Sequence, residues 1–168
     1  MWYVIQTKNG EEVKNMNVCK RALKACSYCN AFVPTYICMK RYEGAWHYEQ
    51  KVLFSGYFFI DTKKPEEVEQ AIAPLDRIMK PVCVGDEFHP IYEEEQLFLE
   101  SLMDSDYNIL MSRGNIVSGV CDVNEGPLKK KTDIIRKINR HKRTADIEVN
   151  LFGQVRLVKI GLEIVDKT

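Results

Sequence analysis

The residues best suited to binding chemistry lie in one basic stretch, residues 124–144, with the sequence NEGPLKKKTDIIRKINRHKRT. This stretch holds eight cations and two acids, a net charge of +6, in a chain whose formal net charge is zero. Clustered cations focus a positive potential that attracts phosphate groups. Basic loops also serve simply as a solvated surface, but their concentration in a neutral chain favours a phosphate-bearing partner. The cations are Lys129, Lys130, Lys131, Arg136, Lys137, Arg140, Lys142 and Arg143.

A second pattern, CSYC at residues 26–29, has the CxxC spacing of metal and redox sites. A structural zinc site needs four ligands, usually two such pairs or one pair with two histidines. The sequence contains no second CxxC, and His47, His89 and His141 occur singly. A redox CxxC opens a helix, whereas this one follows a helical pattern. We therefore expect reduced cysteines packed as small apolar side chains, and no metal or other cofactor.

No arrangement of residues typical of an enzyme is present in the sequence. There is no Gly-rich phosphate loop, HExxH motif or nucleophile elbow. The three consecutive acids Glu93, Glu94 and Glu95 point in different directions on a helix, so they cannot converge on one metal ion. We expect a protein that acts by binding and not by catalysis.

Composition and charge indicate a globular protein with two different modules. The 168 residues are 45% hydrophobic and 29% charged, and no apolar run approaches the ~20 residues that span a bilayer. The first residues, MWYVIQTKNG, do not resemble a signal peptide, so we expect a cytoplasmic location and no membrane partner. Residues 86–106 hold eight acids and no Lys or Arg, in contrast to residues 124–144. A uniformly basic nucleic-acid-coating protein is excluded.

The first part of the chain predicts alternating strands and helices, an α+β sandwich with one antiparallel sheet. The helix from Glu11 has Val13, Met16, Cys19 and Leu23 at three- and four-residue steps, which predicts one buried face. In chain order, we expect strand 2–7, the helix from Glu11, strand 31–44, two extended segments in 45–62, helix 63–75, strand 77–84 and helix 90–104.

From about residue 114 the pattern changes to short β-type runs separated by turn residues. Five such runs in about 50 residues, with no helix required, predict a small five-stranded β-barrel. The predicted domains are residues 1–105 and 116–168, joined by a linker at 106–115.

Both halves resemble NusG-type transcription elongation factors, over nearly the whole chain. WYVIQTKNGEEVK (2–14) is similar to the opening strand and helix of the family's N-terminal (NGN) domain, and FSGYFFI (54–60) to its F-x-G-Y strand. VCDVNEGPLKKKTDIIRKINRHKRTADIEVNLFGQVRLVKIGLEIV (120–165) resembles the SH3-like KOW barrel, with its Gly-Pro pair at Gly126 and Pro127. Asp133 stands where the family usually has a glycine, and Asp tolerates the left-handed conformation better than most residues. This departure and the dense cations make the chain most similar to specialised LoaP-type antiterminators.

The resemblance implies an apolar groove on the first domain that binds the clamp helices of RNA polymerase. Tyr57 and Phe59 would share one face of a strand, while Phe58 would belong to the core. Aromatic anchors of this kind often contribute ~2 kcal/mol or more in an interface. The expected polymerase-binding residues are Phe54, Tyr57, Phe59, Ile78, Met79 and Val82.

Two groups of cations are candidates for binding nucleic acid. Lys14, Arg21 and Lys24 lie on one arc of the first helix; they are either solvated charges or contacts to single-stranded non-template DNA. In the second domain, Lys129 to Lys131 and Arg140 to Arg143 are expected in two turns at one end of the barrel. Together with Arg136, these turns would bind a structured RNA, although KOW domains of the family generally contact ribosomal proteins or other factors.

The resulting hypothesis is a monomeric specialised antitermination factor that holds RNA polymerase with one domain and structured RNA with the other. The first alternative is a general NusG elongation and termination factor. The second is a plain RNA-binding KOW protein that ignores polymerase.

Overall fold

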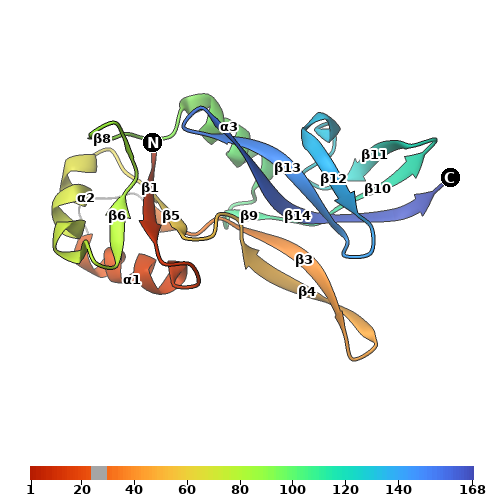
Figure 1. The fold of residues 1–168 in the computed structure, drawn as a ribbon, viewed down its shortest axis with the longest axis horizontal. Coiled ribbons are helices and arrows are strands. Elements are labelled where there is room, and N and C mark those ends of the chain that lie inside the picture. The colour runs from red at the N-terminus through yellow and green to blue at the C-terminus, as the bar shows by residue number, and fades with distance from the viewer. Residues whose placement is uncertain (24–29) are drawn as a thin grey trace. The chain divides into compact units, whose positions relative to one another are not determined.

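The computed structural model describes residues 1–23 and 30–168 (Figure 1). These residues form two compact units: unit 1 is Met1–Pro34 with Phe54–Gln96, and unit 2 is Thr35–Leu53 with Leu97–Thr168. Unit 2 therefore takes a segment from within the sequence of unit 1. The domain boundaries at residues 105 and 115 remain a sequence-based prediction.

Unit 1 contains an antiparallel sheet with strand order β2-β5-β1-β6 and two helices, which confirms the predicted α+β class. β7 and β8 form a separate two-stranded pair. The strands are β1 (Trp2–Thr7), β2 (Asn30–Phe32), β5 (Tyr57–Asp61), β6 (Met79–Pro81), β7 (Cys83–Val84) and β8 (Glu87–Phe88). The helices are α1 (Glu12–Leu23) and α2 (Pro65–Ile72), the latter followed by the 3₁₀ turn η2 (Ala73–Leu75).

The strand register divides the sheet of unit 1 into two faces. We call the face of Tyr3, Ile5, Phe58 and Ile60 the helix face, because Thr7 on the same side of β1 accepts a hydrogen bond from Asn15 of α1. The opposite face carries Trp2, Val4, Tyr57 and Phe59, and we call it the aromatic face. Seven of these eight side chains are buried, and Tyr57 is half-buried.

Helix α1 buries part of the predicted face, Cys19 and Leu23, together with two polar residues that hydrophobic spacing did not predict. Val13 is exposed, whereas the buried residues are Glu12, Asn15, Cys19 and Leu23. The two polar members are satisfied by hydrogen bonds, which removes most of the cost of burying them. Asn15 donates to the Thr7 hydroxyl at 2.5 Å, and the Glu12 carboxylate accepts from the backbone N–H of Gly56 at 2.7 Å and of Gly10 at 3.1 Å. Hydrophobic spacing alone therefore predicted Cys19 and Leu23 correctly, was wrong for Val13, and missed Glu12 and Asn15.

The region predicted as one strand, residues 31–44, forms two strands. β2 ends at Phe32 and pairs with β5, while β3 (Thr35–Tyr42) begins after Pro34 and belongs to unit 2. Proline has no backbone N–H to donate to a sheet, so it separates the two strands. The Val33–Pro34 break is also where the chain passes from one unit to the other.

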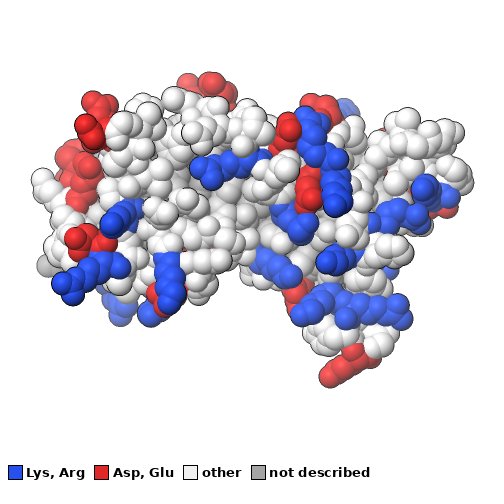
Figure 2. Space-filling view, in the orientation of Figure 1, with Lys and Arg blue, Asp and Glu red and all other residues white. Residues whose placement is uncertain are grey.

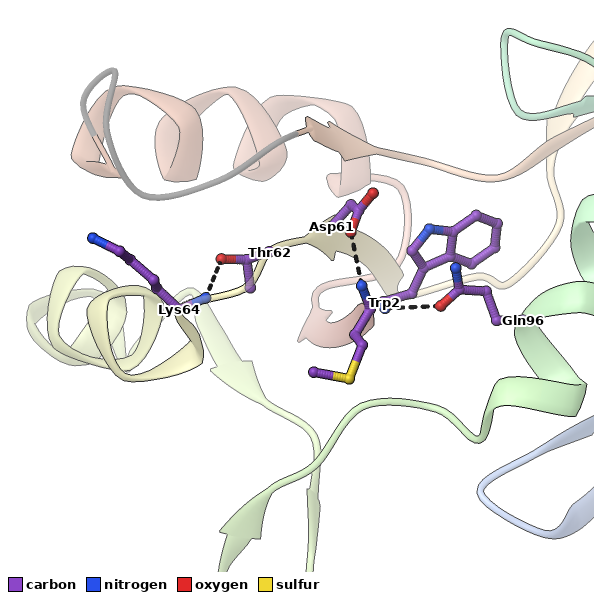
Figure 3. A network of polar contacts seen from close by, with 6 residues as sticks. Trp2, Asp61, Thr62, Lys64 and Gln96 are labelled. Carbon is purple, nitrogen blue, oxygen red and sulfur yellow. Dashed lines mark hydrogen bonds and ion pairs between the residues drawn. The ribbon is translucent and has the colours of Figure 1, made fainter.

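Polar contacts fix the end of the unit 1 sheet at which β1 begins and β5 ends (Figure 3). The Trp2 N–H donates to Gln96 Oε1 at 3.2 Å, which ties the start of β1 to the end of the unit. After β5, the Lys64 N–H donates to the Thr62 hydroxyl at 2.9 Å, immediately before α2 begins at Pro65. Proline suits the first turn of a helix because its missing N–H would be unpaired there.

Helix α3 (Glu93–Leu102) crosses the division between the units. It begins three residues later than the predicted residue 90, and it buries Leu99 and Leu102. One of its three consecutive acids, Glu95, is buried, and its carboxylate accepts the Tyr92 N–H at 3.1 Å. Glu93 and Glu94 are exposed, so the three acids point in different directions, as expected for consecutive positions on a helix.

Unit 2 contains a long hairpin and a five-stranded sheet. In the hairpin, β3 pairs with β4 (Ala45–Val52) on one side and, in parallel, with β9 (Asn108–Ile109) on the other. The five-stranded sheet has the order β11-β10-β14-β13-β12. Its strands are β10 (Ser112–Val117), β11 (Val120–Glu125), β12 (Ile135–Asn139), β13 (Thr144–Leu151) and β14 (Gln154–Lys167), with the 3₁₀ turn η3 (Thr132–Ile134) before β12.

The five strands of this sheet divide differently from the predicted five runs. The single run predicted at 115–123 falls in two strands, β10 and β11, and the two runs predicted at 154–160 and 162–166 form one 14-residue strand, β14. β14 pairs antiparallel with β13 and parallel with β10, so it is the central strand. Closure of the sheet into a KOW barrel remains a prediction. No helix among the described residues is long and apolar enough to cross a membrane.

Candidate nucleic-acid interface

The six residues predicted to bind polymerase do not form one exposed surface. Phe54, Phe59 and Met79 are buried, with exposed fractions of 6%, 0% and 2%. Met79 also lies on the helix face. β6 pairs it with Thr7, and Thr7 shares a face of β1 with Tyr3 and Ile5 because every second residue of a strand points the same way. The prediction that these three residues are exposed in a groove is therefore wrong.

Phe59 is buried because four aromatic rings of unit 1 pack together. Its ring stacks on Phe32 at 5.6 Å between centroids and lies edge-on to Trp2 at 6.1 Å. Phe54 packs against it at 5.8 Å. Such clusters dominate core energetics, so Phe59 is a core residue here.

The other three predicted polymerase contacts, Tyr57, Ile78 and Val82, are exposed or half-buried. Ile78 borders a shallow pocket of about 390 Å³ that also exposes the cations Lys8, Arg77 and Lys80. Sequence reasoning missed this group because Lys8 is far in the sequence from Arg77 and Lys80, and only the pairing of β1 with β6 brings it beside them.

The basic stretch does not form two turns at one end of a barrel. Lys129 to Lys131 precede β12, while Arg140 to Arg143 follow it, so the two turns lie at opposite ends of this strand. At ~3.3 Å per residue, five residues separate the turns by roughly 13 Å or more. The expected single focus of positive charge is therefore wrong, because one strand between two loops places them at opposite ends.

Gly126 of the Gly-Pro pair must be glycine, whereas Asp133 does not adopt the left-handed conformation that favours glycine. Gly126 has φ +92°, and a Cβ there would lie 2.6 Å from the Met111 carbonyl oxygen. Asp133 belongs to η3, and the left-handed residue of this region is Lys130, with φ +63°. The departure from the family pattern thus has no conformational cost at Asp133.

Two of the predicted RNA-binding arginines make ion pairs within unit 2. Arg136 Nη2 bonds Glu148 Oε2 at 2.6 Å, and this hydrogen bond raises the pKa of Arg136 and lowers the pKa of Glu148. Arg143 Nη1 bonds Glu163 Oε1 at 2.8 Å. Among the residues that the structure describes, the other six cations of the stretch form no ion pair. Lys137 lies within β12, and five lie in the turns on either side of it: Lys129, Lys130, Lys131, Arg140 and Lys142.

Arg143 joins the β12–β13 turn to the β3–β4 hairpin. Its guanidinium lies over the Trp46 ring at 4.0 Å, and its Nη1 lies 3.3 Å from the Met39 sulfur. Glu163 also pairs with Arg113 at 3.0 Å, so the carboxylate is shared by two arginines. Sequence reasoning missed the hairpin as part of this site, because Trp46 and Arg143 are almost 100 residues apart.

A groove of about 490 Å³ lies between the outer strands β11 and β12. Arg136 and Lys137 line it together with apolar residues, including Val120, Ile135 and Ile138. This groove combines positive charge with apolar surface on the same unit as the unpaired cations.

The cations predicted on α1 are only partly available. Lys14 lies 3.7 Å from Glu11, a surface pair that weakens its attraction for phosphate. Arg21 is exposed, and Lys24 lies outside the described residues.

The described cysteines do not have the character of reactive thiols. Burial raises the pKa of Cys19 to about 12, and burial also raises the pKa of Cys38, Cys83 and Cys121. The CxxC pair, Cys26 and Cys29, lies outside the described residues. Within residues 1–23 and 30–168, no group of three or more His, Cys, Asp or Glu side chains is placed to hold a metal ion.

The fold places the chain in the NusG-like class of α+β proteins. A solved structure described as "Domain interaction in Thermotoga maritima NusG" is similar over 97% of this chain and 93% of that chain, with a TM-score of 0.55 and 17% identity. Two conformations of the MjSpt4:Spt5 complex match with TM-scores of 0.37 and 0.35 at 13% and 16% identity, over 96% and 100% of this chain and 99% and 100% of those chains.

Residues 1–102 match the family model NusG, described as transcription termination factor nusG. This is more than half of the chain, so the chain belongs to the NusG family. Members of this family are transcription factors and not enzymes.

Proposed function

We propose that this NusG-family protein is a specialised antitermination factor of the LoaP type that binds both RNA polymerase and a structured RNA. The observation that carries the proposal is the group of five unpaired cations at the two ends of β12, in a chain with no net charge. Such cations supply affinity for a phosphate backbone and a steep dependence on salt. The work is done by binding free energy, so no cofactor is required.

Unit 1 would hold the RNA polymerase clamp. The exposed Ile78 and the half-buried Tyr57 and Val82 suit a protein interface, and Arg77 and Lys80 beside Ile78 add charge at its rim. Arg21 on α1 is the remaining described candidate for contact with non-template DNA. Binding one conformation of the clamp preferentially would suppress pausing.

The sheet of unit 2, as a KOW barrel, would bind structured RNA through its phosphates. The two basic turns lie roughly 13 Å or more apart, so they would contact separate points along an RNA backbone instead of one phosphate group. A double-stranded stem offers phosphates at such separations.

The test is a salt titration of binding to an RNA stem–loop from the leader of a neighbouring operon and to a scrambled control. Three double variants remove the same charge: Lys129→Ala with Lys130→Ala, Arg140→Ala with Lys142→Ala, and the control Arg156→Ala with Lys167→Ala. Each of the first two should lower the slope of log K against log salt by about 1 to 2, while the control should not. Arg143 is left intact because of its ion pair with Glu163.

The outcomes separate this function from its rivals. Weak binding that is equal for both RNAs and insensitive to salt would favour a general NusG factor. RNA binding without any association with polymerase would favour a plain RNA-binding protein. Tyr57→Ala should reduce polymerase binding and leave RNA binding intact. Tyr57 belongs to unit 1, whereas the five cations belong to unit 2.

A further inference from the structure

The β3–β4 hairpin carries a row of aromatic and basic side chains that the basic stretch alone does not reveal. β3 and β4 pair Arg41 with Trp46 and Met39 with Tyr48, so these four residues share one face of the hairpin. Tyr48 is 63% exposed, an unusual state for a large aromatic side chain. We call Arg41, Trp46 and Tyr48 the hairpin platform.

The hairpin platform lies next to one of the two basic turns. Arg143, the last residue of the β12–β13 turn, contacts Met39 and Trp46 on this same face. Both of these residues have a platform residue directly opposite them in the register, Tyr48 and Arg41. Arg140 and Lys142, which precede Arg143 in the turn, are therefore brought close to the platform.

Hydrogen bonds and ion pairs hold the β12–β13 turn in one conformation. The Lys142 N–H donates to Asn139 Oδ1 at 2.9 Å, and the Arg143 N–H donates to the Arg140 carbonyl oxygen at 3.3 Å. Arg143 adopts φ +52°, and its carbonyl accepts the Leu162 N–H of β14 at 3.0 Å. Ion pairs from Arg143 and Arg113 to Glu163 fix the guanidinium over Trp46.

The contact between the hairpin and β14 is close at the backbone. A Cβ on Gly161 of β14 would collide with the Ile37 carbonyl oxygen of β3 and with the Met111 sulfur. Only glycine leaves room for β3 at this point. The platform is therefore part of unit 2 and is positioned by its sheet (Figure 1).

We propose that the hairpin platform binds unpaired bases of an RNA loop, beside phosphates held by Arg140 and Lys142. Exposed aromatic rings stack on any unpaired base, and neighbouring cations track the backbone. Figure 2 shows basic side chains gathered over the β3–β4 hairpin and the adjoining strands of the sheet. Arg41, Arg140 and Lys142 form no ion pair in the described part of the chain, so their charge is available to RNA.

This inference rests on the proposed function, and it specifies the single-stranded part of the RNA as the element that the hairpin recognises. A protein partner would also be attracted to exposed aromatic residues. It would not reproduce the dependence on an unpaired loop, so this dependence decides between the two.

The experiment compares two RNA probes, a stem–loop with a single-stranded loop and the same stem as a blunt duplex, with the full-length protein. Tyr48→Ala should weaken binding to the stem–loop on the order of tenfold and leave binding to the duplex unchanged, because one base stack is lost. Tyr48→Phe keeps an aromatic ring and should retain the affinity of the wild type. Because the Tyr48 side chain is exposed, neither substitution should change the temperature of thermal unfolding.

Arg41 and Lys40 provide a matched pair of charge deletions. They are adjacent in the sequence and both exposed, but they lie on opposite faces of the hairpin. Arg41→Ala should weaken binding to the stem–loop and reduce its salt slope by about 0.7, whereas Lys40→Ala should do neither.

The results distinguish failure of this inference from failure of the proposed function. If Arg140→Ala with Lys142→Ala weakens binding but Tyr48→Ala and Arg41→Ala behave like Lys40→Ala, the platform is not an RNA site and the basic turns still are. If the wild-type protein binds neither probe, both proposals are overturned.

Discussion

Glu12 shows how one buried charge can organise a local region of the fold. Its carboxylate links the turn before α1, through Gly10, to the turn before β5, through Gly56. Burial alone would raise the pKa of Glu12, but the N–H groups of Gly56, Glu12 itself and Gly10 bond the charged form and bring the pKa below its ordinary value of 4.5.

Replacing this carboxylate should make stability less dependent on pH. Because the pKa of Glu12 is lower in the folded than in the unfolded protein, its contribution is fully present above about pH 4.5 and is lost as the pH falls through the folded-state value. We expect Glu12→Gln to lower the free energy of unfolding by about 2 kcal/mol at neutral pH. Urea unfolding of both proteins between pH 7 and pH 3 measures this. A difference that stays constant over that range would contradict the pKa assignment.

Phe59 and Tyr57 are two residues apart on the same strand face, yet mutation should affect them differently. Phe59→Ala removes a fully buried ring from the aromatic cluster, so it should cost about 3 to 5 kcal/mol of stability. Tyr57→Ala removes a half-buried side chain and should cost about 1 kcal/mol or less. Urea denaturation followed by circular dichroism separates the two. Equal effects would mean that Phe59 is not part of the core.

Among the elements, the turn from β11 to β12 depends most clearly on one residue type. Gly126 has a positive φ, and a side chain there would meet both the Met111 carbonyl and Ser112. Gly126→Ala should therefore destabilise unit 2 by about 2 kcal/mol or more, whereas Gly119→Ala, also at positive φ but in open space, should cost about 1 kcal/mol. Thermal unfolding of the two variants gives the comparison, and the prediction fails if Gly119→Ala proves the more harmful.

Element types were predictable from the sequence where the pattern was local. β1, α2 with its opening proline, and the β-rich nature of residues 112–167 followed from propensity and turn residues. Cys19 and Leu23 on α1 were also predicted as buried, but Glu12 and Asn15 were not, because only hydrogen bonds with Gly56 and Thr7 make their burial tolerable. Those partners are assembled by tertiary structure, which hydrophobic spacing does not encode.

The candidate sites were predictable in composition but not in arrangement. The excess of cations in residues 124–144 was visible in the sequence, but their division between the two ends of β12 required the strand boundaries. The packing of Arg143 on Trp46 could not be predicted, because these residues come from segments far apart in the chain. Phe59 could not be assigned to the core without its neighbours Trp2 and Phe32, which come from other strands.

For the whole molecule, zero net charge with opposite charges in separate segments should limit solubility. Eight acids lie in residues 86–106 and a net charge of +6 lies in residues 124–144, so copies can attract one another despite their neutrality. We expect minimum solubility near the sequence pI of about 6.8 at low ionic strength, and recovery on adding salt.

A charge-reversal variant tests this explanation. Lys129→Glu with Lys130→Glu replaces two positive charges with two negative charges and lowers the net charge from 0 to −4. The solubility minimum should then move to lower pH and become shallower. Light scattering over pH at two salt concentrations would detect this, and an unchanged minimum would show that apolar surface governs association instead.

The interrupted sequence of unit 1 has a consequence for folding during translation. All of unit 1 has been synthesised by Gln96, while β14, the central strand of the unit 2 sheet, begins only at Gln154. The β3–β4 hairpin therefore emerges from the ribosome long before the strand against which Gly161 and Ile37 approach each other. We expect this hairpin, with Trp46 and Tyr48, to remain without its sheet through the synthesis of about 100 residues (Val52 to Gln154). A nascent chain stalled in that interval should be more sensitive to protease at the hairpin than the finished protein.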